Sequence, residues 1–269
     1  MIRLVIADVD GTLVTQEKLL TKEAIAAAQE LRAADVKLAL TSGRPPRGMQ
    51  MLIEPLQLEG QIAGFNGGVY ANPDMSVVAT RLLPPEVARG AMRLILEKGL
   101  DAWLYTADEW LVRDKGAPHV TREAWTVKFD ARVTPSFPDE LVSRAVKIVG
   151  VSDDHGLVAS CEAVVQAALG ETASAARSQP YYLDVTHPEA NKGAVVVTLS
   201  KLLDIPVDEI ATIGDMPNDV LMFKQSGLSI AMGNASDEVK RQATRVSTSN
   251  EAEGFANAMR QFVLGKGNP

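Results

Sequence analysis

Two aspartates follow directly on a short apolar run near the start of the chain. The run from Leu4 to Ala7 is typical of a strand that is buried on both faces, and the pattern then breaks into Asp8 and Asp10. Because residues i and i+2 of an extended chain point to the same side, we expect these two side chains to project together from the carboxyl end of the strand. Two carboxylates about 4 Å apart repel each other by about 4 kcal/mol at an effective dielectric constant of about 20. A metal ion or a shared proton must therefore relieve the repulsion.

Polar groups also stand where other strands and helices are expected to begin or end. They are Ser42, Lys192, and Asp215 with Asn218 and Asp219. If the strands are parallel, all of these groups converge on one edge of the sheet. Several carboxylates with a lysine and a hydroxyl suit a hard divalent cation together with a phosphate group, because Mg²⁺ favours oxygen ligands and recruits substrate phosphate. Zinc is the poorer match, because this set contains no cysteine and no histidine.

Motif spacing excludes three other kinds of site. A calcium-binding loop that began at Asp8 would need glutamate at its twelfth position, where the chain has Leu19. The G-x-S-x-G turn of a Ser-His-Asp hydrolase is absent, which gives little weight to His119, His155 and His187. The G-x-x-x-x-G-K-[ST] loop of P-loop nucleotide enzymes is absent as well.

The elements that must position the polar groups alternate between strands and helices. Strands are expected over residues 4–7, 36–40, 61–65, 209–213, 228–232 and 245–247, and helices over 22–33, 48–56, 192–203, 220–225, 236–243 and 252–263. Thr21 is a candidate cap of the first helix, and residues from Gly265 onward are expected to fray. This alternation indicates βαβ units. We therefore predict an α/β fold with a Rossmann-like parallel sheet as a core flanked by helices.

The pattern of expected helices and strands changes between residues 84 and 183. Helices are expected there near 86–98, 119–125 and 157–169, and strands near 101–106, 109–113 and 146–151, after a short hairpin over 69–83. We interpret residues 84–183 as an inserted α+β domain, and residues 1–83 with 184–269 as the core that carries the site. Trp103, Trp110 and Trp125 all fall in the insertion. They are expected to fill its core, with stacking on a ligand as the alternative.

Composition limits the class of protein. The chain has 269 residues, 46% of them apolar and 23% charged, which is typical of a globular protein with a sizeable core. A net charge of −7 with no run of lysine and arginine argues against a nucleic-acid surface. Cys161 is the single cysteine, and no apolar stretch reaches about 18 residues. We expect a cytoplasmic protein that has no membrane partner, and the sequence does not indicate its oligomeric state.

Six short motifs, in this order, resemble the haloacid dehalogenase superfamily, specifically its Cof-type (class IIB) phosphatases. The motifs are Asp8-Val9-Asp10-Gly11-Thr12-Leu13, Thr41-Ser42-Gly43-Arg44-Pro45, Asn66-Gly67-Gly68, Asn191-Lys192-Gly193, Gly214-Asp215-Met216-Pro217-Asn218-Asp219 and Ala231-Met232-Gly233-Asn234-Ala235. They span both segments of the expected core, and the insertion stands where that subfamily carries its C2-type cap domain, which confers substrate specificity. Any one of the motifs is weak, but together they are specific.

The resemblance implies roles for individual residues. Asp8 would be the nucleophile that forms an aspartyl-phosphate, and Asp10 the general acid that protonates the leaving alcohol and then activates water. Ser42 and Lys192 would act as catalytic groups that hold the phosphoryl oxygens. Mg²⁺ would be bound by Asp8, Asp10, Asp215 and Asp219, the last either directly or through other groups. The implied substrate contacts come from Ser42, Gly43, Arg44, Asn66, Gly67, Lys192 and Asn218.

The implied activity is Mg²⁺-dependent hydrolysis of phosphate monoesters of small metabolites, either sugar phosphates or phosphorylated cofactors. Two alternatives stay open at this point. A phosphosugar mutase would use the same aspartyl-phosphate and return the phosphoryl group to a sugar. A regulatory protein that binds phosphate would keep the fold without turnover. Arg113, Lys115, His119 and Arg122 could contact the remote end of a substrate, although a solvated surface is the simpler interpretation of these charges.

Overall fold

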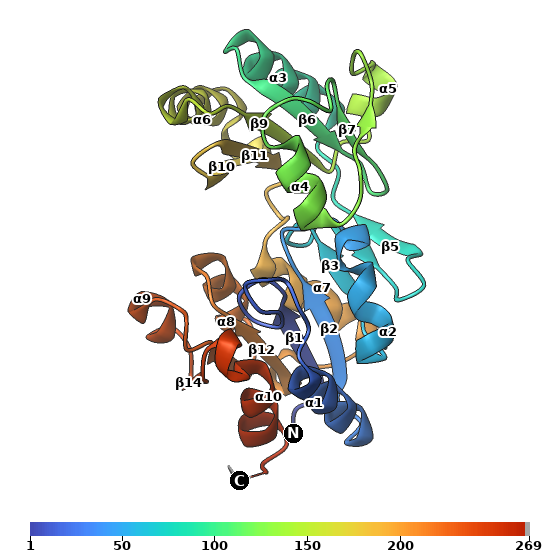
Figure 1. Cartoon of the computed structure of the whole chain (residues 1–269), viewed down its shortest axis with the longest axis vertical. Coiled ribbons are helices and arrows are strands. Elements are labelled where there is room, and N and C mark those ends of the chain that lie inside the picture. Colours follow the sequence, from blue (N-terminus) through green and yellow to red (C-terminus); the bar gives the residue numbers. More distant parts are fainter. Residues whose placement is uncertain (267–269) are drawn as a thin grey trace. The chain divides into compact units, whose positions relative to one another are not determined.

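The chain folds into two compact units in the computed structural model, which describes residues 1–266 (Figure 1). The first unit comprises residues 1–43, 49–78 and the segment from Asn191 onward, and the second comprises 44–48 and 79–190. The segment expected as an insertion, 84–183, lies within the second unit. The expectation that the chain frays from Gly265 onward falls largely outside the described residues.

A single sheet runs through the first unit. In the order in which they pair, its strands are β14 (Arg245–Val246), β13 (Leu228–Ala231), β12 (Ile210–Gly214), β1 (Leu4–Asp8), β2 (Lys37–Thr41), β3 (Ile62–Gly64), β4 (Val69–Ala71) and β5 (Val77–Thr80). The strands from β14 to β3 are parallel, and β4 pairs antiparallel to β3. This topology, with helices along the parallel strands, confirms the predicted α/β class.

The strand β1 lies in the middle of this sheet, as its continuous apolar run predicts. All five of its residues are buried, and Leu4 lies opposite Ile210 on one side and Lys37 on the other. The strand order reverses here, because the chain proceeds from β1 to β2 and β3 in one direction and from β12 to β13 and β14 in the other. Open α/β sheets bind ligands beyond the carboxyl ends of the strands at such a reversal.

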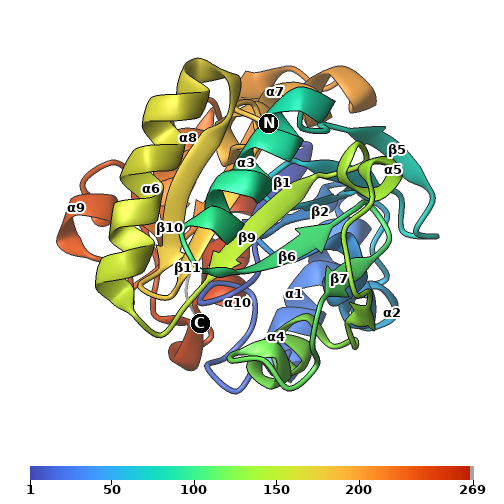
Figure 2. The ribbon, with the colours of Figure 1, turned by 90° about the horizontal axis from the view of Figure 1, so that it is seen from above.

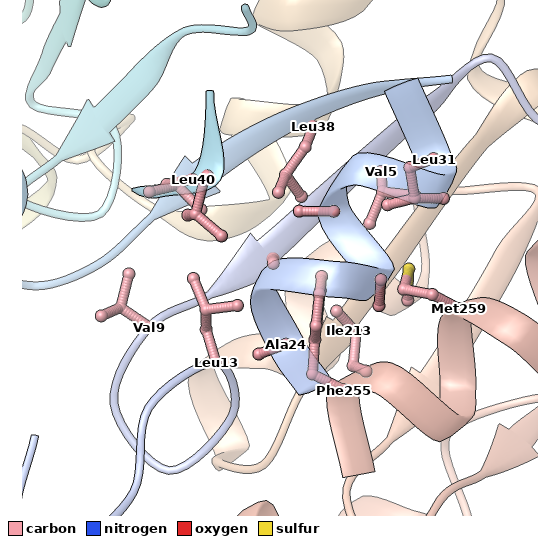
Figure 3. Packing of buried hydrophobic residues seen from close by; sticks show 14 of the residues in the cluster. Val5, Val9, Leu13, Ala24, Leu31, Leu38, Leu40, Ile213, Phe255 and Met259 are labelled. Carbon is pink, nitrogen blue, oxygen red and sulfur yellow. The ribbon is translucent and has the colours of Figure 1, made fainter. Parts of the chain in front are cut away.

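Helices of the first unit are α1 (Lys22–Ala33), α2 (Ile53–Leu56), α7 (Lys192–Leu203), α8 (Val220–Phe223), α9 (Asp237–Lys240) and α10 (Gly254–Ala258), with short 3₁₀ turns at Val207–Glu209, Pro217–Asp219 and Asn250–Ala252. A 3₁₀ segment at Pro46–Leu52 is divided between the two units. The Thr21 hydroxyl accepts a hydrogen bond from the Ala24 amide, so the predicted cap of α1 is confirmed. A cluster of buried side chains joins α1 and α10 to the sheet. Figure 3 shows part of it, including Val5, Leu31 and Met259.

The second unit is an α+β structure with its own core. Its sheet has the strand order β10 (Ser174–Gln179), β11 (Tyr182–Thr186), β9 (Lys147–Val151), β6 (Asp101–Tyr105), β7 (Trp110–Val112) and β8 (Arg132–Val133). Its helices are α3 (Pro85–Glu97), α4 (Val120–Val127), α5 (Asp139–Val142) and α6 (His155–Leu169), with a 3₁₀ turn at Gly170–Thr172. In Figure 2, α3 and α6 run side by side. Their apolar residues form one buried cluster with one face of the sheet.

Several element boundaries differ from the sequence-based expectation. The helix expected over 48–56 is a 3₁₀ segment followed by the four residues of α2. Pro55 lies inside the expected range and lacks the amide that a continuous α-helix needs. The helix expected over 252–263 is divided among a 3₁₀ turn, α10 and a π-helical turn at Met259–Val263.

Residues Arg44–Gly48 belong with the second unit, although the sequence places them next to a core strand. The guanidinium of Arg47 lies over the Phe129 ring, 4.6 Å from its centroid. A Cβ atom at Gly48 would lie 3.0 Å from the carbonyl oxygen of Val127. This close approach of two backbones explains why the position holds glycine. None of the helices within residues 1–266 is long and apolar enough to cross a membrane.

Candidate functional site

The polar groups singled out in the sequence follow neighbouring parallel strands. Asp8 ends β1, Ser42 follows β2, and Asp215 follows β12. Asp8 lies opposite Thr41 in the register of β1 and β2, so Ser42 comes next to the same edge. Lys192 is the first residue of α7, whose N-cap Asn191 accepts a hydrogen bond from the Ala194 amide at 2.9 Å. The carboxyl edge of the sheet therefore carries the site.

A buried lysine is the centre of this site. The Lys192 ammonium donates to Asp8 Oδ1 at 2.6 Å and to Asp219 Oδ1 at 2.5 Å. The three side chains are 3%, 6% and 0% exposed, so the charges are almost completely removed from water. Such a group is stable only when the charges are paired and hydrogen-bonded. The two carboxylates raise the pKa of Lys192 although burial opposes them, so the side chain stays positively charged.

Asp219 is held at both oxygens. While Oδ1 accepts from Lys192, Oδ2 accepts from the amides of Asp215 and Met216 at 2.9 and 2.8 Å. A Cβ atom at Gly214 would lie 2.3 Å from Asp219 Cγ, so this turn requires glycine at that position. Asp219 therefore fixes the turn that presents Asp215 and also orients the lysine.

Three carboxylates lie close enough together to share a cation. Ligand atoms of Asp8, Asp215 and Asp219 are within 4.8 Å of one another. Burial raises the pKa of Asp8 to about 8, with Lys192 opposing and Asp219 adding to the rise. Burial and the charge of Asp219 raise the pKa of Asp215 to about 6. Three carboxylates and one ammonium leave a formal charge of −2, which a divalent cation with oxygen ligands would balance. The donor set thus fits Mg²⁺.

Asp215 is oriented by groups to which the sequence analysis gave no role. Asn234 donates from Nδ2 to Asp215 Oδ2 at 3.1 Å and to the Gly11 carbonyl at 2.9 Å, and the Thr12 hydroxyl donates to Asp215 Oδ1 at 3.5 Å. Gly11 has φ +79°, and a Cβ atom there would lie 2.4 Å from Asp215 Oδ2. The presence of Asn234 in a recognised motif was the signal that could have identified it.

Asp10 does not belong to the carboxylate triad. Its Oδ1 accepts a hydrogen bond from the Lys18 ammonium at 2.7 Å, and the two side chains are 31% and 21% exposed. The strand ends at Asp8, and Asp10 stands in the turn that follows, where it forms an isolated bridge with Val14. Alternation along a continuous strand therefore does not apply to the pair of aspartates. Sequence reasoning missed Lys18, because a lysine in a polar loop carries no distinguishing pattern.

Ser42, Gly43, Asn66 and Gly67 lie together at the ends of β2 and β3. Ser42 is buried, and its carbonyl accepts a hydrogen bond from the Asn66 amide at 2.8 Å. A Cβ atom at Gly43 would lie 3.8 Å from Asn66 Nδ2. Gly67 has φ +101°, and a Cβ atom there would approach Val195 of α7 to 2.8 Å. The loops that follow β2 and β3 thus approach each other closely beside α7, the helix that carries the lysine.

The remaining two predicted residues are Arg44 and Asn218. Arg44 is buried in the second unit, where it donates from Nη1 to the Gly48 carbonyl at 3.3 Å. Asn218 is exposed in the 3₁₀ turn that also contains Asp219. Contact with a substrate is a prediction for both.

Comparison with known proteins finds relatives over almost the whole chain. A family model described as haloacid dehalogenase-like hydrolase matches residues 5–259. YxeH of Bacillus subtilis (strain 168), a candidate phosphatase, is 28% identical over 273 residues, which cover 99% of this chain and all of YxeH. YcsE of the same organism, a 5-amino-6-(5-phospho-D-ribitylamino)uracil phosphatase, is 25% identical over 264 residues, which cover 98% of this chain and 96% of YcsE.

Solved structures show the same fold. A haloacid dehalogenase-like hydrolase from Bacteroides thetaiotaomicron superposes with a TM-score of 0.90 and 27% identity, covering 97% of this chain and 99% of the other. The sugar phosphatase BT4131, of subclass IIB, superposes with a TM-score of 0.80 and 19% identity, covering 97% and 99% of the two chains. At 19% identity, the similarity to BT4131 shows the fold alone.

Proposed function

Because the chain belongs to the haloacid dehalogenase-like hydrolase family, in its Cof-type branch, we propose that it hydrolyses phosphate monoesters of small metabolites through an aspartyl-phosphate at Asp8, with Mg²⁺. That the protein is a hydrolase acting on phosphate monoesters follows from the family and its named phosphatases. The metal, the covalent intermediate and the residue roles are the proposal. Sugar phosphates or phosphorylated cofactors are the substrate classes.

The observation that carries the proposal is the buried ammonium of Lys192 between two carboxylates, with the carboxylate of Asp215 alongside. To catalyse phosphoryl transfer, a protein mainly positions the reacting groups and neutralises the negative charge of the phosphoryl group. A carboxylate nucleophile must approach an anionic phosphoryl group, so it needs positive charge beside it. Lys192 supplies that charge to Asp8 at 2.6 Å and is itself fixed by Asp219.

Asp8 would attack phosphorus with the oxygen that is not held by Lys192. Lys192 would also contact a phosphoryl oxygen, together with the Ser42 hydroxyl and the Gly43 amide. These groups hold the phosphoryl group in line with the nucleophile. The remaining contacts proposed for the substrate are Arg44, Asn66, Gly67 and Asn218.

Mg²⁺ would be held by the side chains of Asp8 and Asp215 and by the carbonyl of Asp10. When bound, it supplies charge neutralisation to the transferring phosphoryl group. Asp219 would orient Lys192 and the turn of Asp215, because both of its carboxylate oxygens already accept hydrogen bonds from these groups.

Asp10 would act as the general acid and then as the base that activates water. Its carboxylate is paired with Lys18 at 2.7 Å, so the proposed role requires it to leave that pair before it protonates the leaving oxygen. The pair is partly exposed, and exposed ion pairs contribute only about 0 to 1 kcal/mol. Breaking the pair of Asp10 and Lys18 would therefore cost little free energy.

The test is release of inorganic phosphate from p-nitrophenyl phosphate and from a panel of phosphorylated metabolites. We expect turnover with Mg²⁺, little in EDTA, and a loss of at least about 10³-fold in Asp8→Asn. Asp204→Asn, at the exposed end of α7, is the control and should keep the wild-type rate. A rate in Asp8→Asn equal to that of the wild type would reject the nucleophile. Conversion of a sugar phosphate to an isomer without phosphate release would favour a mutase, and absence of any turnover a binding protein.

A further inference from the structure

A row of buried side chains crosses the sheet of the first unit at the proposed nucleophile. In the register of the strands, Asp8 of β1 lies opposite Thr41 of β2, and Thr41 lies opposite Ala63 of β3. Directly opposed residues on neighbouring strands point to the same face of a sheet. Asp8 accepts a hydrogen bond from Lys192, so the row faces α7, the helix that begins with this lysine. All four residues belong to the first unit.

The hydroxyl of Thr41 is buried in this row without a hydrogen bond. The residue is 0% exposed, and its Oγ1 has no hydrogen-bond partner among residues 1–266. Native proteins leave few buried polar atoms unpaired, because removing a polar group from water without a compensating hydrogen bond is unfavourable. A valine would fill the same core position without that cost. An unpaired hydroxyl beside a nucleophile therefore indicates a hydrogen bond that forms in another state of the site.

Of the two side chains opposite Thr41, that of Asp8 can accept this hydrogen bond. Ala63, on the β3 side, offers only a methyl group, whereas Asp8, on the β1 side, offers a carboxylate. Neighbouring strands lie about 4.8 Å apart, so a hydroxyl on one strand can reach a carboxylate on the next. Rotation of a threonine by about 120° around χ1 exchanges the places of its hydroxyl, methyl group and hydrogen. The contact therefore needs a change of rotamer and little extra room.

The carboxylate of Asp8 has the capacity for this contact. Its Oδ1 accepts from the Lys192 ammonium at 2.6 Å, and a carboxylate offers about four positions at which it can accept hydrogen bonds. A single donor leaves a carboxylate able to turn about χ2, because the energy wells of this torsion are broad in aspartate. A second donor, from the neighbouring strand, would fix the plane of the carboxylate. A fixed plane directs the attacking oxygen, which is how positioning accelerates a reaction.

A threonine with a purely structural role occupies the same face of the sheet. Thr212 of β12 lies opposite Ile6, two residues before Asp8 on β1, and is also 0% exposed. Its hydroxyl shares a hydrogen bond of 2.7 Å with the hydroxyl of Ser226, so the polar group is paired within the fold. Thr41 differs in this one respect. The comparison therefore separates a hydroxyl that supports the fold from one that the fold leaves unused.

We propose that Thr41 is a positioning residue for the nucleophile, and that its hydroxyl donates a hydrogen bond to the Asp8 carboxylate when the site holds Mg²⁺ and a phosphoryl group. This inference rests on the proposed phosphatase function and adds a residue to its site. Lys192 holds the carboxylate from α7, and Thr41 holds it from β2. Because the hydroxyl is unpaired in the described structure, its removal should lower activity without lowering stability.

The test replaces Thr41 by valine, which keeps the shape of the side chain and removes the hydroxyl. In Thr41→Val we expect kcat for p-nitrophenyl phosphate to fall about tenfold with KM nearly unchanged, as for the loss of one hydrogen bond to a charged group. The thermal midpoint in EDTA should equal or exceed that of the wild type. Thr41→Ser keeps the hydroxyl and should restore kcat. Thr212→Val is the matched control, which should lower the midpoint by breaking the hydrogen bond with Ser226 and leave kcat unchanged.

A crystal structure of the full chain with Mg²⁺ and inorganic phosphate gives a measurement that needs no turnover. We expect Thr41 Oγ1 about 2.7 Å from a carboxylate oxygen of Asp8. A separation above about 3.5 Å, or a kcat in Thr41→Val equal to that of the wild type, would overturn the proposal. A midpoint that falls as far in Thr41→Val as in Thr212→Val would also overturn it, because the hydroxyl would then be paired in the metal-free fold. Failure of the wild type to release phosphate from any ester, with the Thr41 contact present in the crystals, would reject the phosphatase function alone.

Discussion

Replacement of Lys192 by methionine tests how much the buried ammonium contributes to the folded state. Its Nζ lies 2.6 Å from Asp8 and 2.5 Å from Asp219, and none of the three side chains is more than 6% exposed. Without it, the carboxyl groups of Asp8 and Asp219 remain buried beside each other with no positive charge between them. Removal of one partner from a buried ion pair costs about 3–5 kcal/mol. We expect the free energy of unfolding of the metal-free protein to fall by about that amount at pH 8.

The loss should depend on pH in a defined direction. Burial raises the pKa of Asp8 to about 8, and Lys192 holds it below the value that burial alone would give. Methionine removes that opposition, so the pKa of Asp8 rises further and the carboxyl is neutral over a wider range of pH. At pH 5 the Asp8 carboxyl is protonated in both proteins, whereas at pH 8 it is about half ionised in the wild type, which there gains an ion pair with Lys192 that the variant lacks. The loss of unfolding free energy should therefore be smaller at pH 5 than at pH 8.

Urea unfolding in EDTA, followed by far-ultraviolet circular dichroism, measures this effect. Tryptophan fluorescence is less suitable, because Trp103, Trp110 and Trp125 all lie in the second unit. Lys18→Met is the matched control, since Lys18 also pairs with an aspartate of the site but is 21% exposed. It should lose less than about 1 kcal/mol. Equal losses in the two variants, or a larger loss for Lys192→Met at pH 5, would refute the reasoning.

Three further outcomes are expected. Because the pKa of Asp215 is raised from 3.8 to about 6, its stabilising effect on the metal-free fold is fully present below pH 3.8 and is lost as pH rises through about 6. We therefore expect the free energy of unfolding of the wild type, minus that of Asp215→Asn, to fall from pH 3.8 to about pH 6 when it is measured by calorimetry. Mg²⁺ should reverse this fall. A difference that does not change with pH would contradict the prediction. Asn234→Ala should raise the Mg²⁺ concentration for half-maximal activity about tenfold, because Asp215 loses a hydrogen bond of 3.1 Å, and an unchanged Mg²⁺ titration would count against that role. Burial raises the pKa of the Cys161 thiol, so Ellman's reagent at pH 8 should modify the native protein far more slowly than the urea-unfolded protein, and equal rates would refute its burial.

The sequence predicted the parts of the fold that depend on local pattern. The apolar run at Leu4 identified a central strand, and helical spacing after Thr21 identified α1 with its cap. The first residue of α7, Lys192, was correctly placed at a helix start. These signals need only a few neighbouring residues, so they can be read without knowledge of tertiary contacts.

Contacts between distant segments could not be predicted in the same way. That Asp219 holds two backbone amides, and that Lys18 pairs with Asp10, depends on turn geometry that spacing does not determine. Arg44 follows a core strand in sequence but packs in the second unit, because Arg47 and Gly48 contact that unit.

Chemical trapping of the phosphorylated enzyme tests the central claim most directly. The protein is mixed with p-nitrophenyl phosphate and Mg²⁺, quenched in acid, reduced with borohydride, and digested for mass spectrometry. Reduction of an aspartyl-phosphate gives homoserine, so the account predicts homoserine at position 8 in the wild type and none in Asp8→Asn. Homoserine at Asp215 or Asp219, or phosphate release with no modified aspartate at any time, would contradict it.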